Sequence, residues 1–293
     1  MTDRRVTVPH LEDLRRRGAR ATFVTAYDYP TACFADRAGI DLLLVGDSAA
    51  MTMLGLPDTL GIGMREMLVF ARAVARAATR AFVIGDMPFL SYQPSDAAAV
   101  RNAGAFLRAG CQAVKLEGGA RVARRVRAIA RAGIPVMGHL GLTPQSLGQL
   151  GGYRVQGRTR EEAERILADG LWLRDAGIFA LLLEAMPAAA AAYVRDRLDI
   201  PVYGIGAGPL LDGQLLISHD LLGTFVGDVS PRFAKRYVEL GHTITEVFAA
   251  YAADVRAGRF PAPEHCYPMD PDAEAEIRRA REAVAVQEVE SPP

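Results

Sequence analysis

Cysteine is scarce in this sequence, and the three that occur lie far apart. Cys33, Cys111 and Cys266 form no CxxC pair, and none has a histidine at zinc-site spacing. A disulfide framework and a structural zinc site are therefore not expected.

Net charge and long apolar runs are also lacking. The 34 basic and 34 acidic side chains cancel, which argues against a nucleic-acid protein held by phosphate neutralisation, although a local basic patch could survive the average. No stretch reaches the roughly 18 apolar residues that a membrane span requires. We therefore expect no nucleic-acid partner, no membrane partner and a cytoplasmic chain. The 50% hydrophobic content over 293 residues excludes disorder over most of the length.

Lysine is nearly absent as well. Only Lys115 and Lys235 occur among the 34 basic residues, and the rest are arginine. A lysine in a sequence that otherwise uses arginine suggests that its position requires a compact ammonium group whose pKa can be tuned.

What is present is an alternation of short apolar runs with longer amphipathic stretches. The runs predict eight strands: Thr22–Ala26, Leu42–Val45, Phe82–Ile84, Ala113–Leu116, Val136–Met137, Phe179–Leu183, Val202–Ile205 and Leu221–Val226. Helices are predicted at 64–78 and 121–132, and Thr159 with Glu162 forms a capping box that opens a third helix ending at Ala176.

The same helix-to-strand joint recurs four times. An Ala-Gly pair followed by Ile or Cys places Gly39, Gly110, Gly133 and Gly177 where a helix should end in a left-handed cap. Strands that alternate with helices in this way predict an α/β fold, a (β/α)8 TIM barrel, rather than an open doubly wound sheet. The barrel is expected over residues 1–265 with an N-terminal helix, and residues 266–293 are expected to add a short helix from 270 to 284 and a loose tail from 287.

Residues that can take part in catalysis or metal binding follow the ends of the predicted strands. Four carboxylates, one lysine and one histidine follow strands two to six: Asp47, Asp86, Lys115, Glu117, His139 and Glu184. In a barrel these ends share one mouth, so the side chains should converge on one pocket. A single one of them could be only a helix cap, but that explanation does not extend to the whole set.

The residue types suggest roles. Asp47, Asp86 and Glu117, with few nitrogen or sulfur ligands nearby, favour one hard divalent cation, Mg2+. Lys115 suits stabilisation of substrate negative charge, with a Schiff base as the second role open to it. Glu184 is left to act as a base. Gly204-Ile-Gly-Ala-Gly, after the seventh strand, either binds a phosphate or carboxylate or forms a tight turn.

Seven motifs in order resemble one family, the ketopantoate hydroxymethyltransferases, from about residue 10 to His265. They are Thr25-Ala-Tyr-Asp-Tyr, Leu44-Val-Gly-Asp-Ser, Gly85-Asp-Met-Pro-Phe, Val114-Lys-Leu-Glu-Gly-Gly, Gly138-His-Leu-Gly-Leu-Thr-Pro-Gln-Ser, Gly151-Gly-Tyr-Arg-Val-Gln-Gly-Arg and Gly204-Ile-Gly-Ala-Gly. The resemblance implies a barrel of the phosphoenolpyruvate/pyruvate superfamily. It also implies transfer of a hydroxymethyl group from 5,10-methylenetetrahydrofolate to 3-methyl-2-oxobutanoate by a Mg-assisted enolate mechanism, in pantothenate and coenzyme A biosynthesis. Members are typically homo-oligomers, often decamers.

Carried over by motif, the family's functional residues fall on the positions already selected. The resemblance implies metal ligands at Asp47 and Asp86, with Glu117 at or just behind them. Substrate contacts are implied at Asp47, Ser48, Asp86 and Lys115, and the proton acceptor at Glu184. His139 matches a pocket histidine expected to touch the hydroxymethyl end of the product.

The sequence also departs from the family, and these departures leave alternatives open. The loop around Leu56 and Pro57, the pair Leu147-Gly148, and Phe225-Val-Gly-Asp differ from the usual pattern. The chain could thus be a paralogue that acts on a different 2-oxo acid. A superfamily lyase or mutase would need a cysteine after a mid-barrel strand, and a non-catalytic scaffold would be expected to lose a carboxylate; neither feature is found in the sequence.

Overall fold

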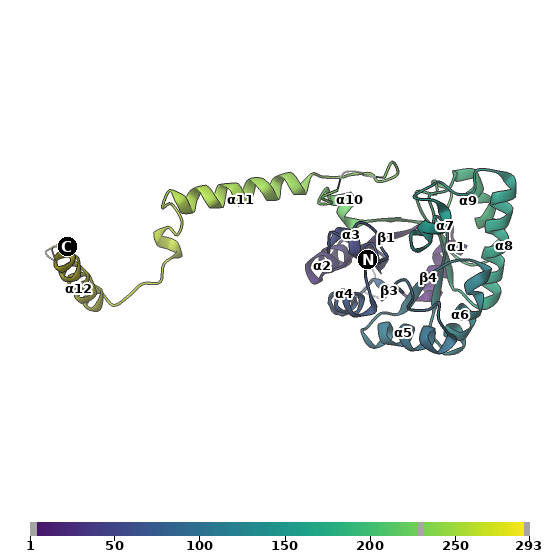
Figure 1. Ribbon diagram of the computed structural model, residues 1–293, viewed down its shortest axis with the longest axis horizontal. Coiled ribbons are helices and arrows are strands. Elements are labelled where there is room, and N and C mark those ends of the chain that lie inside the picture. The colour runs from purple at the N-terminus through teal and green to yellow at the C-terminus, as the bar shows by residue number, and fades with distance from the viewer. Residues whose placement is uncertain (1–4, 228–230, 290–293) are drawn as a thin grey trace. The chain divides into compact units, whose positions relative to one another are not determined.

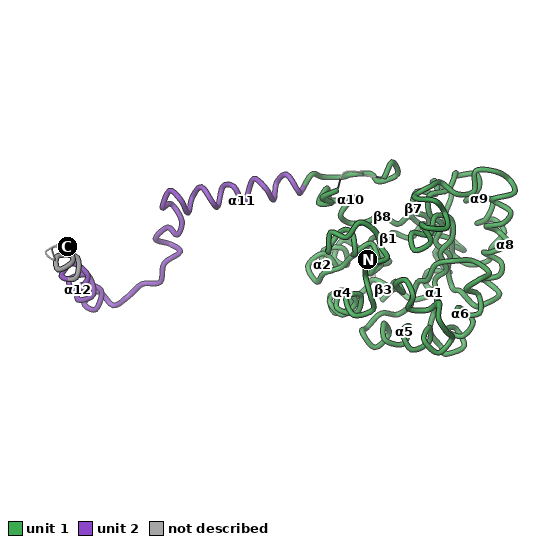
Figure 2. The backbone as a smooth tube through the Cα atoms, viewed as in Figure 1, with its two compact units in different colours: residues 1–239 green, residues 240–293 purple. Residues whose placement is uncertain are grey.

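The structure is a computed structural model that describes residues 5–227 and 231–289. It divides into two compact units, Met1–Glu239 and Leu240–Pro293 (Figure 1, Figure 2). The sequence predicts a later division, after residue 265.

The first unit is a closed barrel. Its strands are β1 (Ala21–Thr25), β2 (Leu42–Val45), β3 (Phe82–Asp86), β4 (Ala113–Glu117), β5 (Val136–Gly141), β6 (Ala180–Glu184), β7 (Val202–Ile205) and β8 (Gly213–Leu216). Each strand pairs in parallel with the next, and β8 pairs in parallel with β1 to close the ring. The predicted eight-stranded parallel barrel is therefore confirmed.

Helices connect the strands and surround them (Figure 1). In the first unit they are α1 (Val8–Arg16), α2 (Tyr29–Arg37), α3 (Ala49–Thr52), α4 (Met64–Ala77), α5 (Asp96–Arg108), α6 (Ala120–Arg131), α7 (Leu147–Leu150), α8 (Arg160–Ala176), α9 (Ala188–Arg195) and α10 (Ser218–Leu222), with a 3-10 turn at Pro144–Ser146. The second unit contains α11 (Leu240–Arg256), a 3-10 turn at Pro263–His265 and α12 (Pro271–Val289).

Two apolar cores follow from the alternation of side chains along each strand. In β2, Leu42 and Leu44 belong to the cluster inside the barrel, whereas Leu43 and Val45 belong to the cluster beneath the outer helices. Successive strand residues point to opposite faces, so one strand supplies both cores. Leu11 of α1 joins the inner cluster.

The helix-to-strand joints form as the sequence predicts. Gly39, Gly110, Gly133 and Gly177 all have positive φ angles, between 82° and 106°. Thr159 caps α8 by accepting the Glu162 N–H at 3.2 Å, but the Glu162 side chain accepts the Arg158 N–H rather than that of the cap residue. Of the two hydrogen bonds of a capping box, the one accepted by the cap side chain is therefore formed, and the reciprocal one is not.

Two predictions about the end of the chain were wrong. The eighth strand is not Leu221–Val226 but Gly213–Leu216; Leu221 and Leu222 belong to α10, and Val226 is almost fully exposed. The tail expected from residue 287 is helical as far as Val289, because its sequence has no glycine or proline before Ser291 to end the helix. Residues 290–293 lie outside the described residues.

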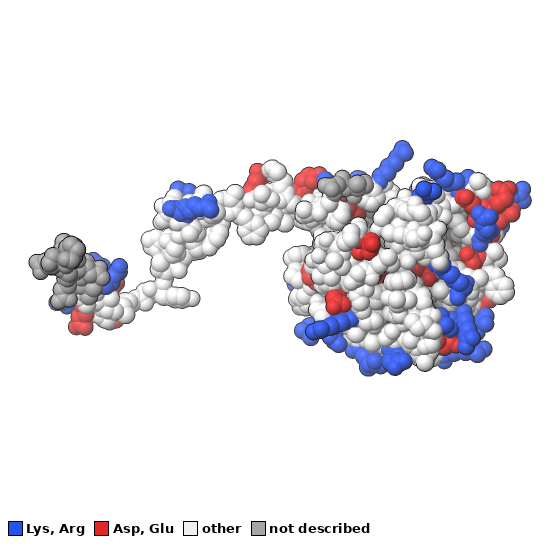
Figure 3. Space-filling model, viewed as in Figure 1, with Lys and Arg blue, Asp and Glu red and all other residues white. Residues whose placement is uncertain are grey.

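Charged side chains cluster on parts of the first unit, although the net charge of the whole chain is zero. Figure 3 shows Lys and Arg side chains gathered over the edge where α5 and α6 lie, and α6 carries five arginines. Arg124 and Arg125 of α6 both pair with Asp96 of α5. Among the helices in residues 5–227 and 231–289, none combines the length and apolar character needed to cross a membrane.

Candidate active site

The predicted polar residues meet at the carboxyl ends of the barrel strands. Asp86, Glu117 and Glu184 are the last residues of β3, β4 and β6. The register sets Asp86 opposite Lys115 and Glu117 opposite His139. Parallel pairing, rather than closeness in sequence, therefore brings these groups together.

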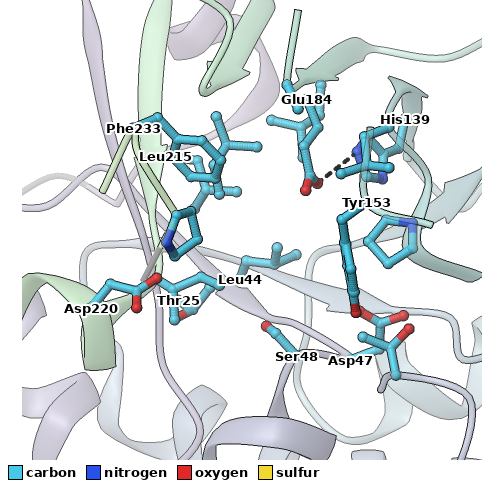
Figure 4. A pocket seen from close by; sticks show the side chains of 18 of the residues that line it. Thr25, Leu44, Asp47, Ser48, His139, Tyr153, Glu184, Leu215, Asp220 and Phe233 are labelled. Carbon is cyan, nitrogen blue, oxygen red and sulfur yellow. Dashed lines mark ion pairs between the residues drawn. The ribbon is translucent and has the colours of Figure 1, made fainter. Parts of the chain in front are cut away.

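A chain of close polar contacts crosses this end of the barrel. Lys115 Nζ lies 2.8 Å from Asp86 Oδ1, 3.6 Å from Glu117 Oε1 and 3.3 Å from His139 Nδ1. His139 Nδ1 lies 3.2 Å from Glu117 Oε1, and its Nε2 lies 3.2 Å from Glu184 Oε2 (Figure 4). His139 thus links the buried acid of β4 to the more accessible acid of β6.

Asp47 and Asp86 are adjacent carboxylates whose burial disfavours their charged forms. The Asp47 N–H donates to Asp86 Oδ2 at 3.1 Å, and both side chains are buried. Burial raises the pKa of Asp47 well above its usual value, and the charges of Asp86 and Glu117 raise it further. Burial also raises the pKa of Asp86, although Lys115 acts in the opposite direction. A bound cation would relieve this repulsion.

The other buried groups favour their charged forms. Burial alone would lower the pKa of Lys115, but Asp86, Glu117 and Asp47 together raise it. Burial alone would raise the pKa of Glu117, but Lys115 and His139 hold it below its usual value. Burial and Lys115 both disfavour protonation of His139, yet its hydrogen bonds to Glu117 and Glu184 raise the pKa of the ring to about 9.

The donor set fits a hard cation that keeps water or substrate ligands. Within the described part of the chain, no three His, Cys, Asp or Glu side chains are preassembled around one metal position. Asp47 and Asp86 form an adjacent oxygen pair, whereas Glu117 accepts the Gln145 N–H at 3.0 Å and contacts His139. One or two carboxylates completed by water and substrate are a common site for Mg2+.

Sequence reasoning missed Gln145, although it lies in a motif quoted for the resemblance. Its Nε2 donates to Asp47 Oδ2 at 2.9 Å and to the Met87 carbonyl at 3.0 Å, and its Oε1 accepts from Tyr92 Oη at 2.8 Å. The side chains of Gln145 and Tyr92 are both buried. An uncharged amide does not stand out among charged groups, and the signal that could have pointed to it is its place in the 3-10 turn Pro144–Ser146, shortly after β5.

Ser48 is held by a buried phenol. Tyr27 Oη and Ser48 Oγ are 2.7 Å apart, so the hydroxyl expected to contact substrate has a fixed partner. Burial raises the pKa of Tyr27 to about 12, which keeps the phenol protonated at neutral pH.

All the predicted site residues line one cavity of about 450 Å³. They are Asp47, Ser48, Asp86, Lys115, Glu117, His139 and Glu184, and the cavity is also lined by Thr25, Tyr153, Leu215, Asp220, Phe225 and Phe233 among others (Figure 4). Leu56, Pro57, Leu147 and Gly148 are not among the lining residues, whereas Phe225 is, and so is Thr59 of the loop that contains Leu56. Two of the three segments that depart from the family pattern therefore reach the cavity wall.

The glycines after β7 form a turn under close packing. Gly206 and Gly208 have φ angles of 64° and 83°, and a Cβ on Gly206 would lie 2.4 Å from the Phe233 ring. The turn interpretation thus has structural support, and the glycines let an aromatic ring cover the strand end.

Known proteins similar in sequence share one description. The family described as ketopantoate hydroxymethyltransferase matches residues 5–263. A 3-methyl-2-oxobutanoate hydroxymethyltransferase of Syntrophobacter fumaroxidans is 53% identical, over 94% of this chain and 96% of its own. One of Moorella thermoacetica is 52% identical, over 90% and 98%.

Solved structures with the same architecture are far more distant in sequence. A phosphonopyruvate hydrolase in complex with oxalate and Mg2+ aligns with a TM-score of 0.59 at 14% identity, covering 98% of each chain. A 2,3-dimethylmalate lyase, a member of the phosphoenolpyruvate mutase/isocitrate lyase superfamily, aligns with a TM-score of 0.55 at 19% identity, covering 97% and 98%. At such identities the likeness establishes the fold alone.

Proposed function

The chain belongs to the ketopantoate hydroxymethyltransferase family, and on that premise we propose how it acts. It transfers a hydroxymethyl group from 5,10-methylenetetrahydrofolate to 3-methyl-2-oxobutanoate and gives 2-dehydropantoate, in pantothenate biosynthesis. The observation that carries the proposal is the contact between His139 and Glu184 beside the buried Asp86–Lys115 pair, at the mouth where the family's motifs converge.

Glu184 is the base in this proposal. Its side chain is 16% exposed while the other charged groups of the site are almost fully buried, so it is the carboxylate best placed to meet a carbon acid in the cavity. Proton removal from carbon next to a ketone needs a base held in position. His139, 3.2 Å away and itself held by Glu117, orients the Glu184 carboxylate.

Asp47 and Asp86 would hold one Mg2+ per subunit, with Glu117 behind them. The ion would supply Lewis-acid polarisation of the keto group and would offset the mutual repulsion of the two carboxylates. Lys115 contributes a fixed positive charge near the substrate carboxylate or keto oxygen, and Ser48 contributes a hydroxyl oriented by Tyr27.

The bonds balance without any further oxidant or reductant. Glu184 accepts the C3 proton, and C3 forms a carbon–carbon bond to the methylene carbon of the folate. The two carbon–nitrogen bonds that held this carbon break, and one water supplies the hydroxyl group of the product. The C3 proton held by Glu184 and one proton of that water go to N5 and N10, and tetrahydrofolate leaves. No cysteine takes part; Cys111 is buried before β4, and Cys33 lies in α2.

Exchange of the C3 proton for deuterium tests the base. With Mg2+ and 3-methyl-2-oxobutanoate but no folate, the wild-type protein should exchange this proton, followed by NMR. Glu184→Gln should lower the exchange rate by at least about 100-fold, because an amide is far too weak a base at neutral pH. Glu164→Gln, whose exposed side chain in α8 pairs only with Arg160, is the matched control and should exchange normally.

Two results would contradict the proposal. Exchange by Glu184→Gln at the wild-type rate would assign the base to another group. Faster wild-type exchange with a straight-chain 2-oxo acid than with 3-methyl-2-oxobutanoate would make the chain a paralogue with a different acceptor.

We also propose a homo-oligomer, with the family's decamer as the expected form. The support lies within the second unit, where five apolar side chains of α11 are exposed at positions that share one helix face: Ile244, Val247, Phe248, Tyr251 and Val255. Such a stripe on a helix commonly marks a surface that is covered in an assembly.

A further inference from the structure

The cavity has a second wall that the proton-transfer chemistry does not use. The charged groups described above come from β2 to β6 and the loops after them. The opposite side is formed from the ends of β1, β7 and β8 and the segments that follow, with the apolar side chains Leu215, Ile217, Phe225 and Phe233. Figure 4 shows Leu215 and Phe233 across the cavity from His139.

Two charged residues, Asp220 and Arg232, interrupt this otherwise apolar wall. Asp220, in α10 just after β8, is only 5% exposed and lines the cavity. Figure 4 shows its carboxylate end beside Thr25, on the far side from Glu184 and His139. Within residues 5–227 and 231–289, no protein group forms a hydrogen bond or an ion pair with its side chain, although the charge of Arg236 acts on it.

A carboxylate that faces a cavity without a protein partner is available to a ligand that supplies hydrogen-bond donors. Burial raises the pKa of Asp220, with Arg236 acting weakly in the opposite direction. A buried charge commonly lacks a protein partner where a ligand supplies one. The neighbouring aromatic wall indicates that such a ligand is flat as well as polar at one edge.

From this arrangement we infer that Asp220 binds the edge of the folate pterin that carries its N3–H and 2-amino groups. The inference rests on the proposed function and assigns the folate a subsite within the same cavity. The two groups are adjacent donors, and a carboxylate with two oxygens can accept from both at once. Phe233, seated over Gly206, provides an apolar surface for the ring.

The chemistry of the folate fits the two-walled cavity. In a tetrahydropterin, N5 lies on the opposite side of the bicyclic ring from the 2-amino group. Anchoring the amino edge at Asp220 would therefore direct N5 and its one-carbon unit toward the wall that holds Glu184 and Lys115. A cavity of about 450 Å³ also lies in the range that buries a drug-sized ligand, more than a five-carbon keto acid fills.

A binding titration with two ligands tests the inference. Tetrahydrofolate and an analogue whose 2-amino group is replaced by hydrogen are titrated by calorimetry into wild type, Asp220→Asn and Asp220→Ala. The wild type should bind tetrahydrofolate about 10- to 100-fold more tightly than the analogue. Both variants should lose most of that preference, because the lost contact is the one the analogue also lacks.

The folate-free exchange reaction separates this inference from the proposed function. Both Asp220 variants should show impaired transfer at low folate, with a KM for 5,10-methylenetetrahydrofolate raised about 10- to 100-fold, while they still exchange the C3 proton. Absence of exchange in the wild type would instead count against the proposed function, whatever Asp220 does. Asp199→Asn, an exposed carboxylate between α9 and β7, is the matched control.

Three outcomes would overturn the inference. The first is wild-type affinity for tetrahydrofolate in both Asp220 variants. The second is an unchanged preference for the 2-amino group in the variants. The third is loss of C3 exchange by a variant whose thermal unfolding is normal, which would place Asp220 with the keto acid. The wild-type comparison of the two ligands remains decisive if neither variant folds, since equal affinity for both would exclude recognition of the amino group.

Discussion

Gln145 connects groups that a reaction would need to keep in fixed relation. Its amide nitrogen reaches Asp47, its backbone N–H reaches Glu117, and its carbonyl oxygen accepts from Tyr92. Because the amide must donate to Asp47 and accept from Tyr92, its orientation is fixed by both partners. It is a positioning residue, since its contacts are to acidic groups of the site rather than to the cavity centre.

We predict that Gln145→Leu lowers kcat/KM for transfer about 10- to 100-fold, which is the usual cost of losing a partner of a metal-site carboxylate. The loss should be accompanied by a weaker apparent affinity for Mg2+, measured from the metal dependence of the rate. Tyr92→Phe should cause a smaller loss of the same kind.

Gln149→Leu serves as the matched control. This glutamine lies nearby in α7, but its side chain contacts exposed Arg121 rather than the acids of the site. If Gln145→Leu matched the wild type in both kcat/KM and metal dependence, its hydrogen bonds to Asp47 would have no part in catalysis.

The charged half of the site could be predicted from the sequence, and the other half could not. Asp86, Lys115, Glu117 and Glu184 follow apolar runs of β-branched and aliphatic residues, so strand ends were easy to place. Asp220 was missed because the eighth strand was assigned after it, which set this residue at the wrong end of the barrel. Once β8 ends at Leu216, Asp220 follows the strand and reaches the mouth.

At the scale of elements, one carboxylate ties the end of α2 to the start of β3. Asp36 accepts the backbone N–H groups of Thr79, Arg80 and Ala81 at 3.0, 3.1 and 2.7 Å, and the Thr79 hydroxyl at 2.7 Å. Burial alone would raise the pKa of Asp36, but these hydrogen bonds hold it below its usual value. The loop before β3 therefore depends on a negative charge.

We predict that Asp36→Asn lowers the free energy of unfolding at pH 7 by about 1–3 kcal/mol, because an amide replaces an acceptor of charged hydrogen bonds. The folded-state pKa lies below the unfolded value of about 3.9. The carboxylate therefore stabilises the fold fully above that unfolded value and loses this effect as the pH falls through the folded pKa.

Urea unfolding followed by circular dichroism between pH 7 and pH 3 measures the effect. The difference in free energy of unfolding between wild type and Asp36→Asn should become smaller toward pH 3. Asp199→Asn, which changes an exposed side chain, should have the wild-type free energy of unfolding at every pH. A gap that stayed constant with pH would mean that the charge of Asp36 has no role.

The misplaced strand shows why element boundaries were harder to predict than element types. Gly213-Gln-Leu-Leu is short, begins with glycine and has an exposed Gln214, so it lacks the apolar run typical of a barrel strand. It pairs on both sides, with β7 and β1. The strand is therefore stabilised by pairing with its two neighbours in the closed ring, since its own sequence does not favour a strand. Leu221–Val226 has the run but contains Gly223 in the left-handed region, which ends α10.

At the scale of the whole molecule, the apolar stripe of α11 should control assembly. We predict that wild-type protein sediments as a homo-oligomer and that Phe248→Glu shifts it to smaller species, because a charge is placed in a surface that assembly would bury. Sedimentation velocity measures both. Ala253→Glu, on the opposite side of the same helix, should leave the sedimentation coefficient unchanged.

A wild-type protein that sedimented as a monomer would contradict the proposed oligomer. A Phe248→Glu variant that kept the wild-type size would instead show that assembly uses another surface.

The closing contact between β1 and β8 also bears on how the protein is made. β1 pairs with β8, and Thr25 at the end of β1 also accepts the N–H of Ser218, in α10, at 3.0 Å. The first strand therefore pairs with a segment almost two hundred residues later in the chain. During translation, at about 5–20 residues per second, Asp86, Lys115, His139 and Glu184 all emerge from the ribosome before this segment has been made. Until then β1 and β7 present unpaired edges, which are templates for aggregation. The nascent chain thus exposes these charged residues for a time outside a closed barrel. A chaperone that shields unpaired strand edges would act during this time.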